Sequence, residues 1–156
     1  MDYIQLTKQT EALTEDCPFL IANLSNTAAL LWQSLPEINW AGFYEVMGEE
    51  LILGPFQGKP ACIRIPVGKG VCGTAVSENR MQRVADVHAF PGHIACDSAS
   101  SSEIVIPLHA AGKIWGVLDI DSPVPERFTE MDAKGLQMVC NEIEKFLSRC
   151  CYGAAY

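Results

Sequence analysis

The spacing of apolar side chains predicts two helices in the first part of the chain. From Phe19 to Leu35, apolar residues recur every three or four positions, and Pro36 then ends the helix. A weaker pattern of the same period runs from Tyr3 to Asp16, with polar side chains on the outer face. We therefore expect two helices before the first strand.

The middle of the chain has the pattern of short strands and hairpins. β-Branched, aromatic and alternating apolar residues are separated there by turn-forming residues. One short helix is expected over 71–78, and the Gly- and Pro-rich segment 54–60 is expected to be a loop. The predicted strands cover residues 39–46, 51–54, 61–66, 82–86, 103–109 and 114–121.

A long amphipathic helix is predicted after these strands. It begins near Thr129, which can cap the first turn together with Asp132, and it runs to about Arg149. Hairpin connections in place of repeated helical crossovers indicate an α+β fold on an antiparallel sheet. We expect one domain over residues 1–156, with N-terminal helices in 1–36, the sheet and pocket in 37–128 and the last helix in 129–150.

Composition and charge restrict the partners of such a domain. The chain has 156 residues, and 49% are apolar, which is enough for a packed core. The 19 acidic and 11 basic side chains give a net charge of −8, so nucleic acid and anionic membranes are not expected as partners. The chain starts without a basic and apolar leader, and no segment reaches about 20 apolar residues, so we expect a cytoplasmic location.

Seven cysteines make thiol chemistry the first candidate activity. In a reducing compartment, an odd number of cysteines favours free thiols with transient redox roles over a fixed disulfide framework. Cys96 is the leading candidate because it lies in a polar loop directly before a predicted strand, with His93 and several serines nearby. Such a loop can expose a thiolate and donate hydrogen bonds to it. The alternative is a surface loop whose cysteine has no chemical use.

Acidic side chains at the ends of the predicted hairpin 103–121 could supply a proton. Asp119 and Asp121 are two residues apart on a strand, so both carboxyl groups project from one face. Glu103 begins the neighbouring strand and can add a third carboxyl group. Carboxyl groups held close together raise one another's pKa, so one can stay protonated near neutral pH and act as an acid. The alternative is a solvated strand end.

An aromatic pair in the first predicted strand could form a binding slot. Trp40 and Tyr44 are four residues apart and share a face, with Gly42 between them. Two aromatic walls over a glycine would leave a flat gap for a small or methyl-bearing group. Packing in the core is the alternative explanation for the same pair.

Metal binding is a rival use of the cysteines. Three cysteines and a histidine could together hold zinc, but no Cys-x-x-Cys pair is present, so no metal site is predicted; the set is Cys62, Cys72, His93 and Cys96. The cysteines in or beside helices are expected to be small apolar residues or incidental thiols, and these are Cys17, Cys140, Cys150 and Cys151.

Four segments of the sequence resemble one enzyme family. They are 68–75 (GKGVCGTA), 91–97 (PGHIACD), 102–107 (SEIVIP) and 116–122 (GVLDIDS). These segments are similar to the free methionine-(R)-sulfoxide reductases, which are built on a GAF domain, and the resemblance extends from about Trp40 to the last helix. It implies a six-stranded antiparallel sheet with helices on one face and a closed small-molecule pocket on the other.

The resemblance implies an oxidoreductase that reduces free L-methionine (R)-S-oxide to L-methionine without a bound cofactor. In the family pattern, Cys96 matches the cysteine that attacks the sulfoxide sulfur and becomes a sulfenic acid. Cys62 matches the cysteine that resolves it as a disulfide, which thioredoxin then reduces. Cys72 matches a third cysteine that could share in the recycling. Asp121 with Glu103 would protonate the sulfoxide oxygen.

The other matched residues would bind the substrate. Trp40 and Tyr44 match the aromatic residues that hold the methyl group, and Asp119 or Glu103 is expected near the ammonium group. A closed pocket would refuse a methionine sulfoxide within a peptide. The substrate carboxylate is expected near the backbone amides of Ile94, Ala95 and Cys96.

Two alternatives stay open at this point. A GAF-type module could bind a small ligand, or register oxidants through Cys62 and Cys96, without being an enzyme. The family also tends toward homodimers, and the two N-terminal helices could form such an interface or pack on their own sheet. The tail from Cys150 to Tyr156 has no counterpart in the family pattern.

Overall fold

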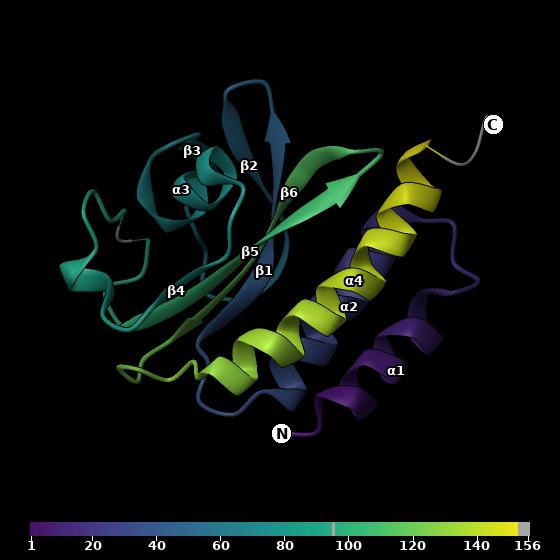
Figure 1. The fold of residues 1–156 in the computed structure, drawn as a ribbon, viewed down its shortest axis with the longest axis horizontal. Helices are drawn as coiled ribbons and strands as arrows, with labels where there is room; N and C mark the ends of the chain where they lie inside the picture. The colour runs from purple at the N-terminus through teal and green to yellow at the C-terminus, as the bar shows by residue number, and fades with distance from the viewer. Residues whose placement is uncertain (95, 153–156) are drawn as a thin grey trace.

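The computed structural model describes residues 1–94 and 96–152 of the chain (Figure 1). Within these residues, six strands form one antiparallel sheet in the order β3-β2-β1-β6-β5-β4. The predicted α+β fold on an antiparallel sheet is therefore confirmed. The strands are β1 (Trp40–Met47), β2 (Glu50–Gly58), β3 (Arg64–Pro66), β4 (Gln82–Val84), β5 (Ser102–Ala110) and β6 (Lys113–Ser122).

The helices are divided unequally between the two faces of the sheet. Helices α2 (Leu20–Ser34) and α4 (Glu130–Tyr152) pack on one face, and α1 (Tyr3–Thr14) packs against them (Figure 1). The short helix α3 (Gly70–Glu78) lies on the other face. Among the described residues, no helix combines the length and apolar content needed to span a bilayer.

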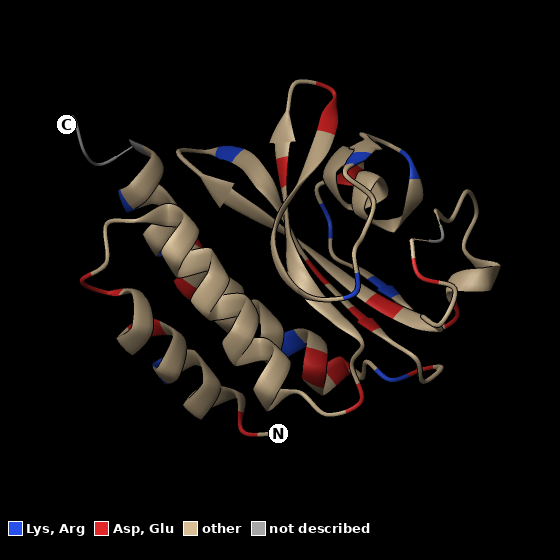
Figure 2. Cartoon of the chain, turned by 180° about the vertical axis from the view of Figure 1, so that it is seen from behind, with Lys and Arg blue, Asp and Glu red and all other residues tan. Residues whose placement is uncertain are grey.

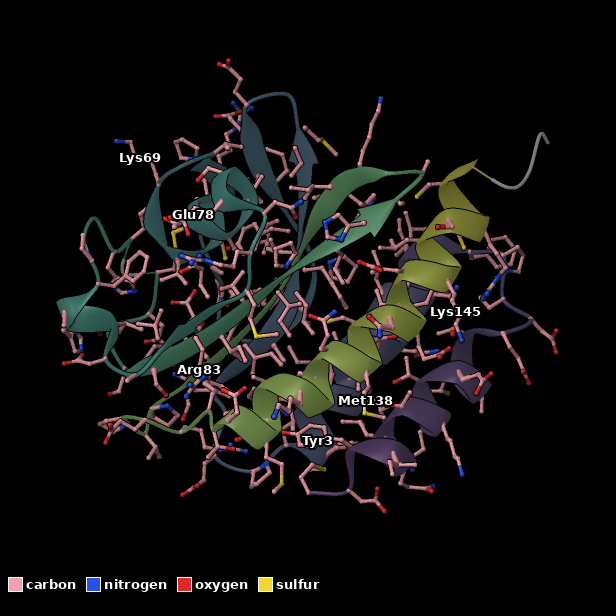
Figure 3. All side chains as sticks on the ribbon, in the orientation of Figure 1. Tyr3, Lys69, Glu78, Arg83, Met138 and Lys145 are labelled. Carbon is pink, nitrogen blue, oxygen red and sulfur yellow. A yellow bond between two sulfur atoms is a disulfide. The ribbon has the colours of Figure 1, made fainter. Side chains whose placement is uncertain are left out.

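Alternation along the strands sends neighbouring side chains into two separate cores. Phe43 and Ile106 join the cluster beneath α2 and α4, whereas Tyr44 and Val105 join the cluster beneath α3. Side chains fill the space between the sheet and α4 (Figure 3). The face beneath α3 is less completely covered, because one short helix and the surrounding loops are its only lid within the described residues.

The start of α4 is capped as the sequence predicts. The Asp132 amide donates to the Thr129 hydroxyl at 3.2 Å, and the Thr129 amide donates to the Asp132 carboxylate at 2.8 Å. The Tyr3 hydroxyl also donates to Asp132, which ties the beginning of α1 to the beginning of α4.

The structure corrects the predictions for β2 and β3. The segment 54–60 was expected to be a loop, but β2 continues to Gly58, which pairs with Trp40. Pro55 is accommodated because the β1–β2 register shifts between Gly42 and Tyr44, which leaves an extra residue on β2 opposite Phe43. The predicted strand 61–66 is a strand only from residue 64, since residues 59–62 turn toward the loop that carries Cys96.

Candidate active site

A cavity lies on the face of the sheet that α3 covers. Its walls come from β1, β3, β5, β6 and α3, together with residues 59–61, 93–94 and 96–100. Most of the residues singled out by sequence lie around this one space. The lining residues are Trp40, Tyr44, Lys59, Pro60, Ala61, Ile65, Gly70, Val71, Cys72, His93, Ile94, Cys96, Asp97, Ser100, Glu103, Asp119 and Asp121.

The sheet register brings the three predicted acids together. Glu103 on β5 lies directly opposite Asp121 on β6, and Trp40 on β1 lies opposite Asp121 from the other side. Asp119 is two residues before Asp121, so it points into the same cavity. Acidic positions on neighbouring strands of the sheet are visible in red in Figure 2. The carboxyl groups of Glu103 and Asp119 are buried, and Asp121 is partly exposed.

Burial shifts the titration of all three carboxyl groups. It raises the pKa of Glu103 and of Asp121 well above the usual range, and the negative charge of Asp119 raises both further. Burial raises the pKa of Asp119, and hydrogen bonds with the Cys72 and Glu103 side chains lower it. The net result is a pKa of about 6. Asp119 is therefore the first of the three to ionise as pH rises, and the raised pKa values of Glu103 and Asp121 favour their protonated forms. These neutral acids are able to donate protons.

One oxygen of Asp119 has no partner within the described protein. Asp119 Oδ1 is buried and accepts no hydrogen bond from the described residues. An unpartnered buried carboxylate oxygen is costly, so its presence in a cavity favours a ligand that donates to it. An ammonium group would satisfy this oxygen.

Two of the predicted cysteines are joined at the cavity wall. Cys62 and Cys96 form a disulfide with a Cα–Cα distance of 5.6 Å. The Tyr44 hydroxyl donates to the Cys62 carbonyl oxygen at 2.8 Å, which holds the Cys62 segment against the sheet. Cys72 lies apart from this pair as a free, buried thiol on α3. Burial raises the pKa of the Cys72 thiol well above its usual value, and the carboxyl groups of Asp119 and Glu103 raise it further.

The aromatic pair forms a wall, but the gap predicted over Gly42 is filled. Trp40 stacks on Tyr44 at a centroid distance of 5.9 Å and on Phe56 at 5.2 Å. A Cβ at Gly42 would collide with Phe56 and with the Trp40 ring, so glycine is needed for this packing. The prediction of an open slot over Gly42 is wrong, because the extended β2 strand places Phe56 there. Trp40 and Tyr44 still line the cavity.

The loop that carries Cys96 also brings polar side chains to the cavity and its rim. His93 Nε2 lies 3.9 Å from Glu103 Oε2, and Lys59 Nζ lies 3.7 Å from Asp97 Oδ2 across the rim. Burial lowers the pKa of His93. Ile94 packs over Gly70, whereas Ala95 lies outside the described residues. Contacts between the loop and the distant β2 end could not be read from local sequence patterns.

The cysteines do not form the zinc set considered from the sequence. Two sulfurs of that set are bonded to each other in the Cys62–Cys96 disulfide. A different set, Cys72, Glu103 and Asp119, has possible ligand atoms within 4.8 Å of one another. A metal would need these groups deprotonated, and burial raises the pKa of each. The cluster therefore suits proton donation better than metal binding.

Asp119→Asn is expected to stabilise the protein above neutral pH. The pKa of Asp119 rises from 3.8 to about 6 on folding, so the folded state is favoured while the group is protonated and loses stability as pH rises through this range. Asparagine does not ionise, so the variant should gain on the order of 1 kcal/mol or more at pH 8 and little at pH 4. Urea unfolding between pH 4 and 8 measures this, with exposed Asp16→Asn as the control. An unchanged pH slope in Asp119→Asn would contradict the electrostatic assignment.

Comparison with known proteins places the chain in a family. It matches the GAF domain over residues 19–147. It is 59% identical to protein YtsP of Bacillus subtilis over 95% of this chain and 92% of that protein. It is 55% identical to the free methionine-R-sulfoxide reductase of Escherichia coli over 94% and 88% of the two chains. The Neisseria meningitidis free methionine-R-sulfoxide reductase in complex with its substrate superposes with a TM-score of 0.93 at 43% identity, covering 97% of this chain and 92% of that one. The chain belongs to the GAF domain family and, within it, to the free methionine-R-sulfoxide reductases.

Proposed function

We propose that this protein reduces free L-methionine (R)-S-oxide to L-methionine, with Cys96 as the nucleophile and Cys62 as the resolving thiol. The proposal is based on the Cys62–Cys96 disulfide, which lies in the wall of a cavity that also contains three protonatable carboxyl groups. A thiol pair beside neutral acids is what sulfoxide reduction requires, because the oxygen leaves sulfur only when it is protonated. Relatives that carry this enzyme name support the substrate.

The first step transfers one oxygen atom from the substrate to the enzyme. In the reduced enzyme, the Cys96 thiolate attacks the sulfoxide sulfur while Glu103 and Asp121 protonate the oxygen. The hydroxyl group so formed moves to the Cys96 sulfur, the sulfur–sulfur bond made in the attack breaks, and methionine leaves with the electron pair of that bond, so Cys96 is left as a sulfenic acid. Both acids are suited to this task because desolvation and the negative charge of Asp119 raise their pKa values, which favours the protonated forms.

The second step forms the disulfide and releases water. The Cys62 thiol condenses with the Cys96 sulfenic acid, and the hydroxyl group leaves as water. A thioredoxin-like dithiol then reduces the disulfide by exchange and is itself oxidised. This cycle requires a reducing compartment such as the cytoplasm. Cys72 can enter the exchange only if the cavity rearranges, because it is buried on α3.

Three fixed contacts account for the choice of substrate. The ammonium group binds the unpartnered Asp119 oxygen, and the methyl group rests against Trp40 and Tyr44. The oxygen faces Glu103 and Asp121, so methyl, oxygen and side chain have defined directions around the sulfur. That arrangement fits one sulfur configuration. A carboxylate bound by amides of the loop 94–96 would leave no room for a continuing peptide.

The Cys96 amide constrains where the carboxylate can bind. In this oxidised form the Cys96 amide donates to the Ile94 carbonyl oxygen at 3.1 Å. We infer that reduction of the disulfide frees the loop, so that its amides can turn toward the substrate carboxylate. The Lys59–Asp97 ion pair at the rim can then close the loop over β2 again.

Separate removal of the two thiols is expected to give different defects. Cys96→Ser should lose turnover entirely, because it has no nucleophile. Cys62→Ser should release about one methionine per enzyme and then stop with thioredoxin as reductant, leaving a Cys96 sulfenic acid that dimedone labels. Methionine release and labelling are measured by mass spectrometry, with Cys17→Ser as a control that keeps full activity. Steady turnover of Cys62→Ser at the wild-type rate would rule out its resolving role.

Separate substitutions of Glu103 and Asp119 are expected to affect different kinetic constants, kcat in one case and KM in the other. Glu103→Gln removes a proton donor and should lower kcat by about 10²-fold or more. Asp119→Asn removes the charge that meets the ammonium group and should act mainly by raising KM. In wild type, kcat should fall as pH rises through the raised pKa of Glu103, because only its protonated form is an acid. Initial rates between pH 6 and 9 measure all three effects, and equal kcat and KM defects in the two variants would contradict these roles.

A further inference from the structure

The segment between α1 and α2 is held against the last turns of α4. The two segments lie side by side in both views (Figures 1 and 2). Arg149 Nη2 donates to the Thr14 carbonyl oxygen at 2.9 Å. The side-chain amide of the buried Asn23 donates through Nδ2 to the Cys17 carbonyl oxygen at 3.0 Å and to Cys150 Sγ at 3.6 Å. These contacts fix the junction without any covalent link.

Two free thiols, Cys17 and Cys150, lie at this junction. Cys150 Sγ lies 3.9 Å from the Cys17 carbonyl oxygen, so it sits over the Cys17 backbone. Both side chains are partly exposed. Cys17 Sγ lies 3.8 Å from the Phe19 carbonyl oxygen, and rotation about χ1 would move it among its staggered positions. The Asn23 amide, which is 1% exposed, is directed at both cysteines and keeps Cys150 Sγ in place.

We propose that Cys17 and Cys150 are a second oxidisable pair, which a hydroperoxide converts to an intramolecular disulfide. The Cys150 thiolate attacks one oxygen of the hydroperoxide, the oxygen–oxygen bond breaks, and water or an alcohol leaves. The Cys17 thiol then condenses with the Cys150 sulfenic acid and releases water. Two thiols are oxidised and one hydroperoxide is reduced, so no further reactant is needed.

The other free cysteines are less suited to this reaction. Cys72 and Cys140 are buried, and burial raises the pKa of both thiols well above the usual value. Cys151 packs partly against the core, and burial raises its pKa as well. A thiol with a raised pKa has less thiolate available to react with an oxidant. Cys151 is nevertheless the natural control, because it is the neighbour of Cys150 in the sequence.

The disulfide would join the segment between α1 and α2 to the last turns of α4. It links residues 133 positions apart, and cross-links of long chain segments restrict the unfolded state most strongly. It lies on the helix-covered side of the sheet, away from the Cys62–Cys96 pair, so the reductase cycle can proceed with it formed or open. The oxidants that make methionine sulfoxide would therefore also stabilise the protein that removes it. The junction geometry stands independently of the proposed reductase activity.

Peptide mapping after oxidation tests the pairing. The reduced full-length protein is treated with hydrogen peroxide, blocked with N-ethylmaleimide and cut after glutamate without reduction. This cleavage separates residues 16–37, which contain Cys17, from residues 145–156, which contain Cys150 and Cys151. We expect these two peptides to be linked in wild type and in Cys151→Ser, and the link to be absent in Cys150→Ser and Cys17→Ser. Oxidised wild type should melt roughly 5 °C above oxidised Cys17→Ser, whereas the two reduced proteins should melt together.

Three results would overturn the proposal. The first is alkylation of both Cys17 and Cys150 under conditions in which the Cys62–Cys96 disulfide forms. The second is a disulfide between the adjacent Cys150 and Cys151. The third is a linkage that runs between molecules, seen as a dimer on a non-reducing gel. Loss of reductase activity has no bearing on any of them, so failure here is distinguishable from failure of the proposed function.

Discussion

Three carboxyl groups share one cavity, and holding them there opposes folding. A buried carboxylate loses its hydration, and each like charge beside it adds to the penalty. The cross-strand register of Trp40, Asp121 and Glu103 fixes this arrangement, so it cannot relax without breaking the centre of the sheet. The raised pKa values of Glu103 and Asp121 reduce this penalty, because they favour the neutral forms of both groups. The same protonation provides the acid that sulfoxide chemistry requires.

The rest of the site depends on the parts of the sheet that hold these acids. Tyr44 packs in the core beneath α3, and its hydroxyl group fixes the backbone of Cys62. The Cys62–Cys96 disulfide then draws the Cys96 loop over the carboxyl groups. On the opposite face, α2 and α4 bury a second, larger cluster that contributes apolar stabilisation without approaching the reacting groups. The face beneath α2 and α4 therefore contributes mainly to stability, and the face beneath α3 holds the reacting groups.

Sequence patterns were sufficient where local periodicity and long-range packing agree. The helices α2 and α4, the hairpin of β5 and β6, and the shared face of Asp119 and Asp121 all follow from spacing. The patterns failed where tertiary pairing overrides local preference: Gly54 and Pro55 suggest a loop, yet β2 continues past them because β1 pairs with it beyond a register shift. For the same reason, local patterns do not predict that Phe56 fills the space over Gly42. The pairing of Cys62 with Cys96 came from the family resemblance, since spacing alone cannot choose among seven cysteines.

The most direct test of the account is turnover of the separated R and S epimers of free methionine sulfoxide by the reduced protein, with dithiothreitol as the electron source. The proposed contacts for the methyl group, the oxygen and the ammonium group admit one configuration at sulfur, and we predict methionine formation from the R epimer alone. The S epimer should give no more product than the Cys96→Ser variant does. If folded, reduced protein converts neither epimer but still forms the Cys62–Cys96 disulfide with peroxide, the cavity belongs to a redox-sensing GAF domain and the enzyme assignment is wrong.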